Sequence, residues 1–213
     1  MQIVHYPHPV LRQKSTEVQR IDDDLRKTIA AMFELMYAAK GVGLAANQVG
    51  LPFRFFVVNF DGDPNEKEHE FVFINPVITN RKGTDTDEEG CLSLPGLYAD
   101  VRRANEVVIE AYDLDGLGYQ LTLEGLPARI VQHELDHLDG VMFIDRVADS
   151  VKREIDSKVN SYVDRHIAAQ KAGTLPSDAD LQQQVKQLLA GGKIPTPGPV
   201  VLPTTTEKKS EKT

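Results

Sequence analysis

Two histidines four positions apart, His133 and His137, have the clearest chemical potential in the sequence, and Glu134 directly follows the first. Residues at i and i+4 of a helix lie on one face about 6 Å apart, so both imidazoles could bind one metal ion. Glu134 would then lie beside the metal, where a carboxylate can act as a general base. The pattern therefore predicts a metal-dependent hydrolase, against the plainer alternative of two surface histidines.

A catalytic metal site needs three protein ligands and an open position for water, so a third ligand must come from elsewhere in the chain. The metzincin extension is excluded, because residues 138–143 read Leu-Asp-Gly-Val-Met-Phe and contain no His. Cys91 is the only cysteine; it cannot form an intramolecular disulfide, and thiolates bind first-row metals strongly. Spacing alone does not choose among Cys91, the many carboxylates and the other imidazoles, which belong to His5, His8, His69 and His166.

Apolar residues recur at helical spacing in residues 22–39, 126–138 and 149–169. The second of these helices lies between Gly125 and Gly140 and carries the His-Glu-x-x-His motif. The third has His166 on its apolar face, where we interpret it as a semi-buried packing residue.

Strands are predicted where Val, Ile and aromatic residues are concentrated, at residues 53–59, 71–75, 107–112 and 119–123. Residues 113–116 read Asp-Leu-Asp-Gly, which favours a tight hairpin over part of a calcium loop. The predicted fold class is α+β. We expect small, mostly antiparallel sheets packed around a central metal-binding helix, with an N-terminal and a C-terminal helix.

The chain has 213 residues, which fits one catalytic domain over residues 1–170 and an extension over 171–213. The extension contains a short helical pattern at 178–190. A segment rich in Pro, Thr and Lys follows from residue 194, lacks core-forming residues and is expected to be disordered.

Composition narrows the class of protein. The formal net charge is −8, which argues against a nucleic acid as the main partner, because phosphate binding depends on clustered Lys and Arg. The N-terminus lacks the pattern of a signal peptide, and no stretch approaches the roughly 18 apolar residues of a membrane span. We therefore expect a cytoplasmic protein without membrane contact.

Three motifs carry a resemblance to a known family. Residues 41–48 read Gly-Val-Gly-Leu-Ala-Ala-Asn-Gln, residues 89–93 read Glu-Gly-Cys-Leu-Ser, and residues 132–137 read Gln-His-Glu-Leu-Asp-His. Together, and in this order, they resemble the three motifs of the peptide deformylase family. The resemblance runs from about Ile3 to the helix that ends near Ala169.

The resemblance implies a mechanism. It makes Cys91, His133 and His137 the ligands of one divalent metal, and Glu134 the base that later acts as the acid. It also implies that the side-chain amide of Gln48 and the backbone N–H of Leu92 stabilise the oxyanion; a cap or core hydrogen bond is the alternative for Gln48. The family typically works with ferrous iron and accepts nickel, cobalt or zinc, whereas a Cys and two His by themselves suit zinc.

The resemblance also implies the substrate, which is the N-formylmethionyl end of nascent polypeptides. The peptide would add as a strand beside the first motif, with contacts from Gly43, Leu44 and Gly90. For the methionine pocket we nominate Val42, Leu126 and Ile130, although helix residues of this type are more often core. Some relatives carry an arginine near Tyr98 that contacts the peptide, so the contacts there are expected to differ.

A nascent-chain substrate favours a transient ribosome contact, which Lys152, Arg153 and Lys158 of the third helix or the Lys-containing tail could make; we expect a monomer. Two alternatives stay open. The first is a His-Glu-x-x-His peptidase that cleaves internal peptide bonds, and the second is a non-catalytic, metal-stabilised module that binds nascent chains. A closed structural site would need a fourth protein ligand.

Overall fold

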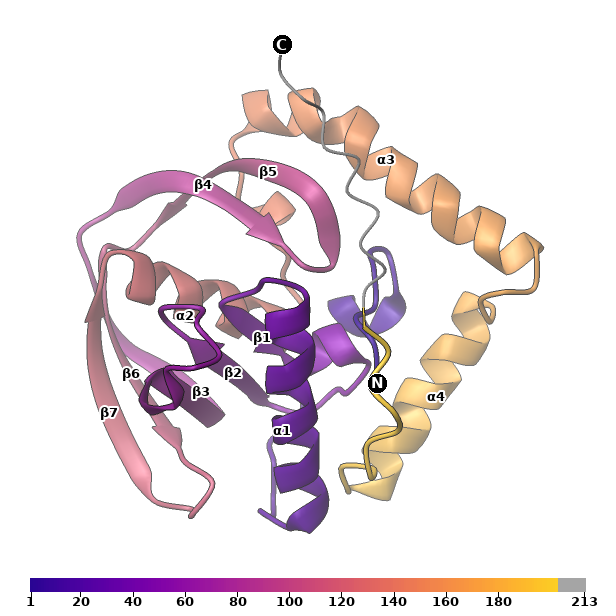
Figure 1. Ribbon diagram of the computed structural model, residues 1–213. Coiled ribbons are helices and arrows are strands. Elements are labelled where there is room, and N and C mark those ends of the chain that lie inside the picture. The colour runs from indigo at the N-terminus through magenta and orange to yellow at the C-terminus, as the bar shows by residue number, and fades with distance from the viewer. Residues whose placement is uncertain (203–213) are drawn as a thin grey trace.

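The structure is a computed structural model that describes residues 1–202. Figure 1 shows a twisted sheet with helices on both faces and two further helices at the C-terminal side. The helices are α1 (Asp23–Ala38), α2 (Leu126–Leu138), α3 (Asp149–Lys171) and α4 (Asp178–Gly191). The strands are β1 (Gly43–Ala45), β2 (Phe55–Asn59), β3 (Glu70–Lys82), β4 (Asp85–Cys91), β5 (Leu94–Arg103), β6 (Glu106–Tyr112) and β7 (Gly118–Glu124).

Five strands form an antiparallel sheet in the order β1-β2-β3-β6-β7, so β1 and β7 are its edges. Residues 113–117 close the β6–β7 hairpin, and the Asp113 carboxylate accepts the backbone N–H groups of Asp115 and Leu117. The Asp113 carboxylate therefore binds backbone within the hairpin turn that the sequence predicts. The α+β class predicted from the sequence is confirmed.

Strand β2 lies between two helices. Phe55 and Val57 face the core around α1, whereas Phe56 and Val58 face the core around α2, because successive side chains of a strand point to opposite faces. Each such fully buried side chain contributes about 1.5–3 kcal/mol of transfer free energy. Packing on both faces therefore fixes α2 against the sheet.

Strands β4 and β5 form a separate two-stranded antiparallel sheet. The sequence did not predict it, because β4 begins Asp-Thr-Asp-Glu and its first four residues are exposed, which leaves no apolar alternation to detect. Strand β5 does alternate, with Leu97, Ala99 and Val101 buried. This hairpin carries Cys91 at the end of β4.

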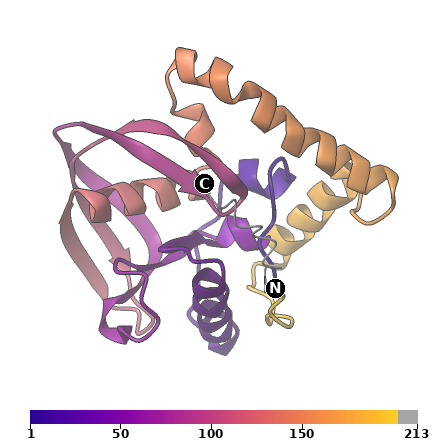
Figure 2. The ribbon, with the colours of Figure 1, turned by 45° about the horizontal axis from the view of Figure 1, so that its top comes forward.

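Helix α3 runs past β5, and α4 folds back toward the N-terminal segment, as Figures 1 and 2 show. The Tyr162 hydroxyl donates to the Pro95 carbonyl at 2.6 Å, which joins α3 to β5. His166 is buried, as its position in the apolar stripe indicates, and its Nε2 lies 2.7 Å from Asp178 Oδ1 at the start of α4.

The segment that begins at residue 194 was expected to lack core-forming residues, but the structure shows one in the core. Ile194 is only 7% exposed and packs in the core around α1, and the Thr196 hydroxyl donates to Asp24 Oδ1 at 2.8 Å. A single Ile in a Pro-rich stretch has no periodicity, so its partner on α1 could not be found locally. The rest of the expected disordered tail, residues 203–213, lies outside the described residues.

None of the helices in residues 1–202 combines the length and the apolar character needed to cross a membrane.

Candidate active site

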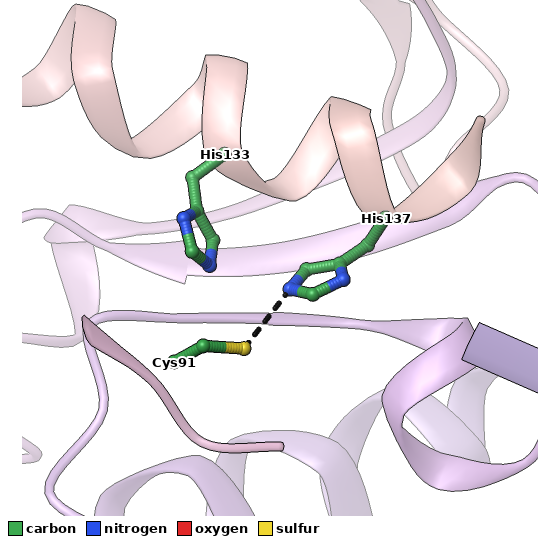
Figure 3. Close-up of side chains that lie close together, drawn as sticks. All are labelled: Cys91, His133 and His137. Atoms are coloured by element: carbon green, nitrogen blue, oxygen red, sulfur yellow. Dashed lines mark hydrogen bonds between the residues drawn. The ribbon is translucent and has the colours of Figure 1, made fainter. Parts of the chain in front are cut away.

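The side chains of Cys91, His133 and His137 converge, with ligand atoms that all lie within 4.8 Å of one another. Figure 3 shows both imidazoles of α2 turned toward the sulfur that the β4–β5 hairpin supplies. The Cys91 Sγ lies 3.3 Å from His137 Nε2. Among residues 1–202, this cluster of candidate metal ligands has these three members.

The other candidate third ligands lie elsewhere or have other partners. His69 pairs with Asp61, and His166 pairs with Asp178. His8 accepts the backbone N–H of Val10 at 3.2 Å. Cys91 is therefore the candidate that the fold brings to the histidine pair.

The two imidazoles have different electrostatic surroundings. Burial and the nearby charges of His133 and Arg103 hold the pKa of His137 well below its usual range, so its ring is neutral, which is the form that binds metals. Burial also opposes the charged form of His133, yet its hydrogen bonds to Cys91 and Glu89 raise the pKa to about 10. The Nδ1 of His133 lies 2.9 Å from Glu89 Oε2, so Nε2 is the ring nitrogen directed at Cys91. A bound cation would replace the proton on this nitrogen.

A buried charge network surrounds Glu89. Burial alone would raise the pKa of the Glu89 carboxyl, but hydrogen bonds from Arg103 and His133 outweigh it and hold the pKa well below its usual range. Arg103 donates to both Glu89 oxygens at 2.8 Å and also to Asp136 on α2 at 2.5 Å. Carboxylates that fix a ligating histidine in this way orient its ring and raise its basicity.

Sequence reasoning missed this network. One signal was present: Arg129 follows Ala128 and precedes Ile130 inside the predicted apolar helix, where a buried charge requires a partner. Nothing local shows that the partner is Glu89, forty positions earlier.

Glu134 is buried beside strand β1. It is 4% exposed, and its Oε2 has no hydrogen-bond partner among the described residues. Burial raises the pKa of Glu134 to about 7, against the lowering effect of the His133 charge. A buried carboxyl group with an unused oxygen and a pKa near neutrality can accept and return a proton.

Gly43 is required by this arrangement, since an added Cβ would lie 2.5 Å from Glu134 Oε1. We expect Gly43→Ala to displace the carboxylate and lower kcat about 10²-fold, the loss typical of a misplacement near 1 Å. Steady-state kinetics with a metal analysis of the same sample would check this. Gly191→Ala at the end of α4, where an added Cβ meets nothing within 4 Å, is the control for loss of a glycine. A Gly43→Ala enzyme with normal kcat would contradict the prediction.

Gln48 lies in a 3₁₀ turn, Ala46–Val49, directly after β1. Its Oε1 accepts the backbone N–H of Ala45 at 2.8 Å, and its Nε2 points at Cys91 Sγ at 3.4 Å. The first contact fixes which end of the amide is the donor. An N–H donor is therefore directed at the cluster from the β1 side.

Leu92 and Gly90 flank Cys91 and pack closely. A Cβ at Gly41 would lie 2.7 Å from Leu92 Cδ1, and a Cβ at Gly90 would lie 2.5 Å from the Tyr98 ring. Glycine at both positions lets backbone and side chain approach this closely. Tyr98, near which some relatives carry an arginine, therefore packs directly over Gly90.

The residues nominated for substrate contacts separate into two groups. Val42 and Leu126 are 37% and 58% exposed, whereas Leu44 is fully buried and Ile130 is 5% exposed within the core between α2 and the sheet. Leu44 can therefore offer only its backbone to a ligand. Strand β1 is a sheet edge, so its outer backbone faces no other strand of the described residues.

One thiolate and two imidazoles make a donor set that suits a first-row divalent cation. The buried, unpartnered Glu134 Oε2 and the donor of Gln48 fit the surroundings of such an ion with a water or substrate oxygen beside it. With three protein ligands the site resembles an open catalytic centre more than a closed structural one.

Comparisons with known proteins identify the family of the chain. The Polypeptide deformylase family profile matches residues 1–153. A peptide deformylase of Rhodopirellula baltica is 44% identical over 184 residues, covering 86% of this chain and 91% of the relative. Peptide deformylase 1B of Arabidopsis thaliana, named as chloroplastic/mitochondrial, is 42% identical over 78% of this chain and 62% of its own.

Solved structures give the same answer. A Plasmodium falciparum peptide deformylase superposes with a TM-score of 0.76 at 39% identity, covering 78% of this chain and 98% of that one. A plant peptide deformylase 1B also gives a TM-score of 0.76, at 41% identity, covering 83% of this chain and 95% of its own. The extent of these matches and the shared fold place the chain in the polypeptide deformylase family.

Proposed function

We propose that this peptide deformylase hydrolyses the formyl–nitrogen bond of N-formylmethionyl nascent chains with Cys91, His133 and His137 as metal ligands and Glu134 as the proton carrier. The observation that carries the assignment is the convergence of the three ligand atoms within 4.8 Å. Glu134, next to the first histidine, adds a carboxylate that a purely structural metal site does not need.

When bound, a divalent cation lowers the pKa of water from 15.7 to about 7 and polarises a carbonyl oxygen, so hydroxide is supplied at neutral pH. Glu134 would take the proton that water loses, through its Oε2, which has no hydrogen-bond partner among residues 1–202. Protonated Glu134 then gives that proton to the methionine amine, because an amide nitrogen leaves readily only when it is protonated. Addition of hydroxide to the formyl carbon and cleavage of its bond to that nitrogen would give formate and a free amino terminus.

Oxyanion stabilisation is assigned to Gln48 Nε2 and to the backbone N–H of Leu92. The Gln48 amide is held by Ala45 before any substrate binds, so little reorganisation is needed during the reaction. Burial of the site strengthens a hydrogen bond to developing negative charge.

Gln48→Ala is expected to lower kcat about 10²–10³-fold, the usual loss when one oxyanion donor is removed. KM and metal content should change much less, because the donor acts on charge that forms in the transition state. Gln48→Glu is a matched variant: it keeps the acceptor for Ala45 and removes the donor. Gln48→Ala with wild-type kcat would leave Gln48 with the alternative structural role.

The peptide is proposed to pair with β1 as an added strand, through the backbone of Gly43 and Leu44. Backbone pairing binds extended peptides without reading their sequence, which suits an enzyme that acts on most new proteins. Val42 and Leu126, both exposed, are proposed to contact the methionine side chain. Ile130 would contribute only from the edge of the core, and Gly90 would contact the peptide beside Tyr98.

Iron(II) is the proposed native metal on family resemblance, with zinc, nickel and cobalt as the alternatives. The proposal includes a monomeric enzyme located in the cytoplasm. Lys152, Arg153 and Lys158 are exposed on α3 and are proposed to make a transient ribosome contact. If replacing these three residues by Ala left ribosome co-sedimentation unchanged, the proposed contact would be wrong.

The test of the proposed function uses protein purified without oxygen. Bound metal and formate release from formyl-Met-Ala-Ser are measured in the same sample, and apo protein is the control. Formate release that requires metal supports the proposal. A metal-loaded protein that releases no formate contradicts it, and cleavage of unformylated peptides at internal bonds would identify a peptidase instead.

A further inference from the structure

Arg129 is a buried arginine in the first turns of α2, one helical turn before His133. Its side chain is only 7% exposed. A guanidinium cannot lose its charge at neutral pH, so a buried one must be compensated by hydrogen-bonded partners. The partners of Arg129 show what it holds together.

Among residues 1–202, the guanidinium contacts lie on the β4–β5 hairpin. The Nη1 atom donates to Glu89 Oε1 and to the Val101 carbonyl, both at 2.8 Å, and lies 3.5 Å from the Asp87 carbonyl. The Nη2 atom donates to the Asp85 carbonyl at 3.3 Å. One side chain of α2 therefore binds backbone on β4 and on β5.

Glu89 links Arg129 to the metal-site cluster. Its Oε1 accepts from Arg129, and its Oε2 lies 2.9 Å from His133 Nδ1. Arg129 and His133 are four residues apart and lie on one face of α2, so a single carboxylate can reach both. Glu89 is also two residues before Cys91 on β4, the strand that supplies the sulfur.

The three proposed metal ligands come from two separate parts of the fold. Cys91 comes from the two-stranded β4–β5 sheet, whereas His133 and His137 come from the helix that packs on the five-stranded sheet. The distance between sulfur and imidazoles therefore depends on what joins the hairpin to α2. Arg103 of β5 makes one such connection through Asp136 of α2, and Arg129 makes a second one from α2 with a rigid, planar donor group.

We propose that Arg129 is a positioning residue that sets the metal-site geometry, by tying the β4–β5 hairpin to α2 and orienting His133 through Glu89. This inference rests on the proposed metal site. A lysine at this position would keep the charge but could not fork between Glu89 and the hairpin carbonyls.

The test measures the affinity of the apo protein for Co²⁺ or Zn²⁺ by competition with a chelator. Arg129→Lys is expected to bind either ion about 10–100-fold more weakly, the usual effect of losing a partner outside the ligands themselves. The thiolate-to-cobalt charge-transfer band, which reports on the Cys91 bond, should shift or weaken. Arg54→Lys is the matched control, because Arg54 bonds Asp139 at the end of α2 and the Pro76 carbonyl, away from the hairpin.

A double-mutant cycle with Glu89→Gln tests the route of the effect. If Arg129 acts through Glu89, Arg129→Lys should cost much less in the Glu89→Gln background than in the wild type. Additive losses, or an Arg129→Lys affinity within twofold of wild type, would overturn the proposal. Thermal unfolding of each apo variant separates a merely structural role, which would lower the unfolding temperature and leave the affinity of the folded protein unchanged.

Arg129→Gln replaces Arg129→Lys if the lysine variant does not fold, because it is neutral and keeps an N–H donor for the Val101 carbonyl. The same 10–100-fold loss is expected of it. Failure of wild-type protein to bind Co²⁺ or Zn²⁺ would contradict the proposed metal site itself, whereas wild-type binding without an effect in the variants would contradict only the role of Arg129.

Discussion

Glu134→Ala is expected to abolish formate release while the protein stays folded and keeps its metal. General acid–base catalysis by one group contributes about 10²–10⁴-fold, and Glu134 is proposed to serve first as base and then as acid. Its Oε2 has no partner among the described residues, so its loss leaves no broken hydrogen bond at that atom. The measurements are kcat for formyl-Met-Ala-Ser and metal content by elemental analysis.

Two matched variants sharpen this result. Glu134→Gln keeps the shape of the side chain against Gly43 and removes the base, so it should be as inactive as Glu134→Ala. Glu88→Gln changes an exposed acid on β4 and should leave kcat unchanged. Turnover near the wild-type rate in both Glu134 variants would remove this carboxylate from the mechanism.

Cys91→Ala is expected to lose both metal and activity. Two imidazoles then remain as ligands, and metal affinity should fall by more than about 100-fold, beyond the loss seen when only an outer partner of a ligand is removed. Competition with a chelator measures the affinity, and the formate assay measures the activity at the same metal concentration.

The fold of Cys91→Ala should survive, because alanine fills most of the volume of a small buried thiol and typical single substitutions cost about 1 kcal/mol. Thermal unfolding of the apo variant checks this. A folded Cys91→Ala protein with a full complement of metal would show that the ligand set is different, and Glu89 and Glu134 are buried carboxylates near the cluster that could supply the third ligand.

Much of the fold could be predicted from local pattern. The helices at 22–39, 126–138 and 149–169 correspond to α1, α2 and α3 within a few residues, and the four predicted strands correspond to β2, β3, β6 and β7. These elements have apolar residues at a regular spacing, because each packs one or both faces on a core. Strand β4 has exposed acids in place of regularly spaced apolar residues, so it forms through its pairing with β5 and cannot be predicted from local pattern.

The candidate site divides in the same way. His133, Glu134 and His137 were predicted together from sequence alone, since four residues of helix place two side chains on one face regardless of the rest of the protein. Cys91 was added to them by the resemblance to the family and not by any local pattern, and the tertiary structure brings it beside the two histidines. Only the tertiary structure decided that Glu89 joins His133 to Arg103 and Arg129, and that Ile194 packs in the core around α1. These contacts connect residues far apart in the chain, and their geometry depends on how the β4–β5 hairpin, α2 and the C-terminal segment pack, which no local periodicity records.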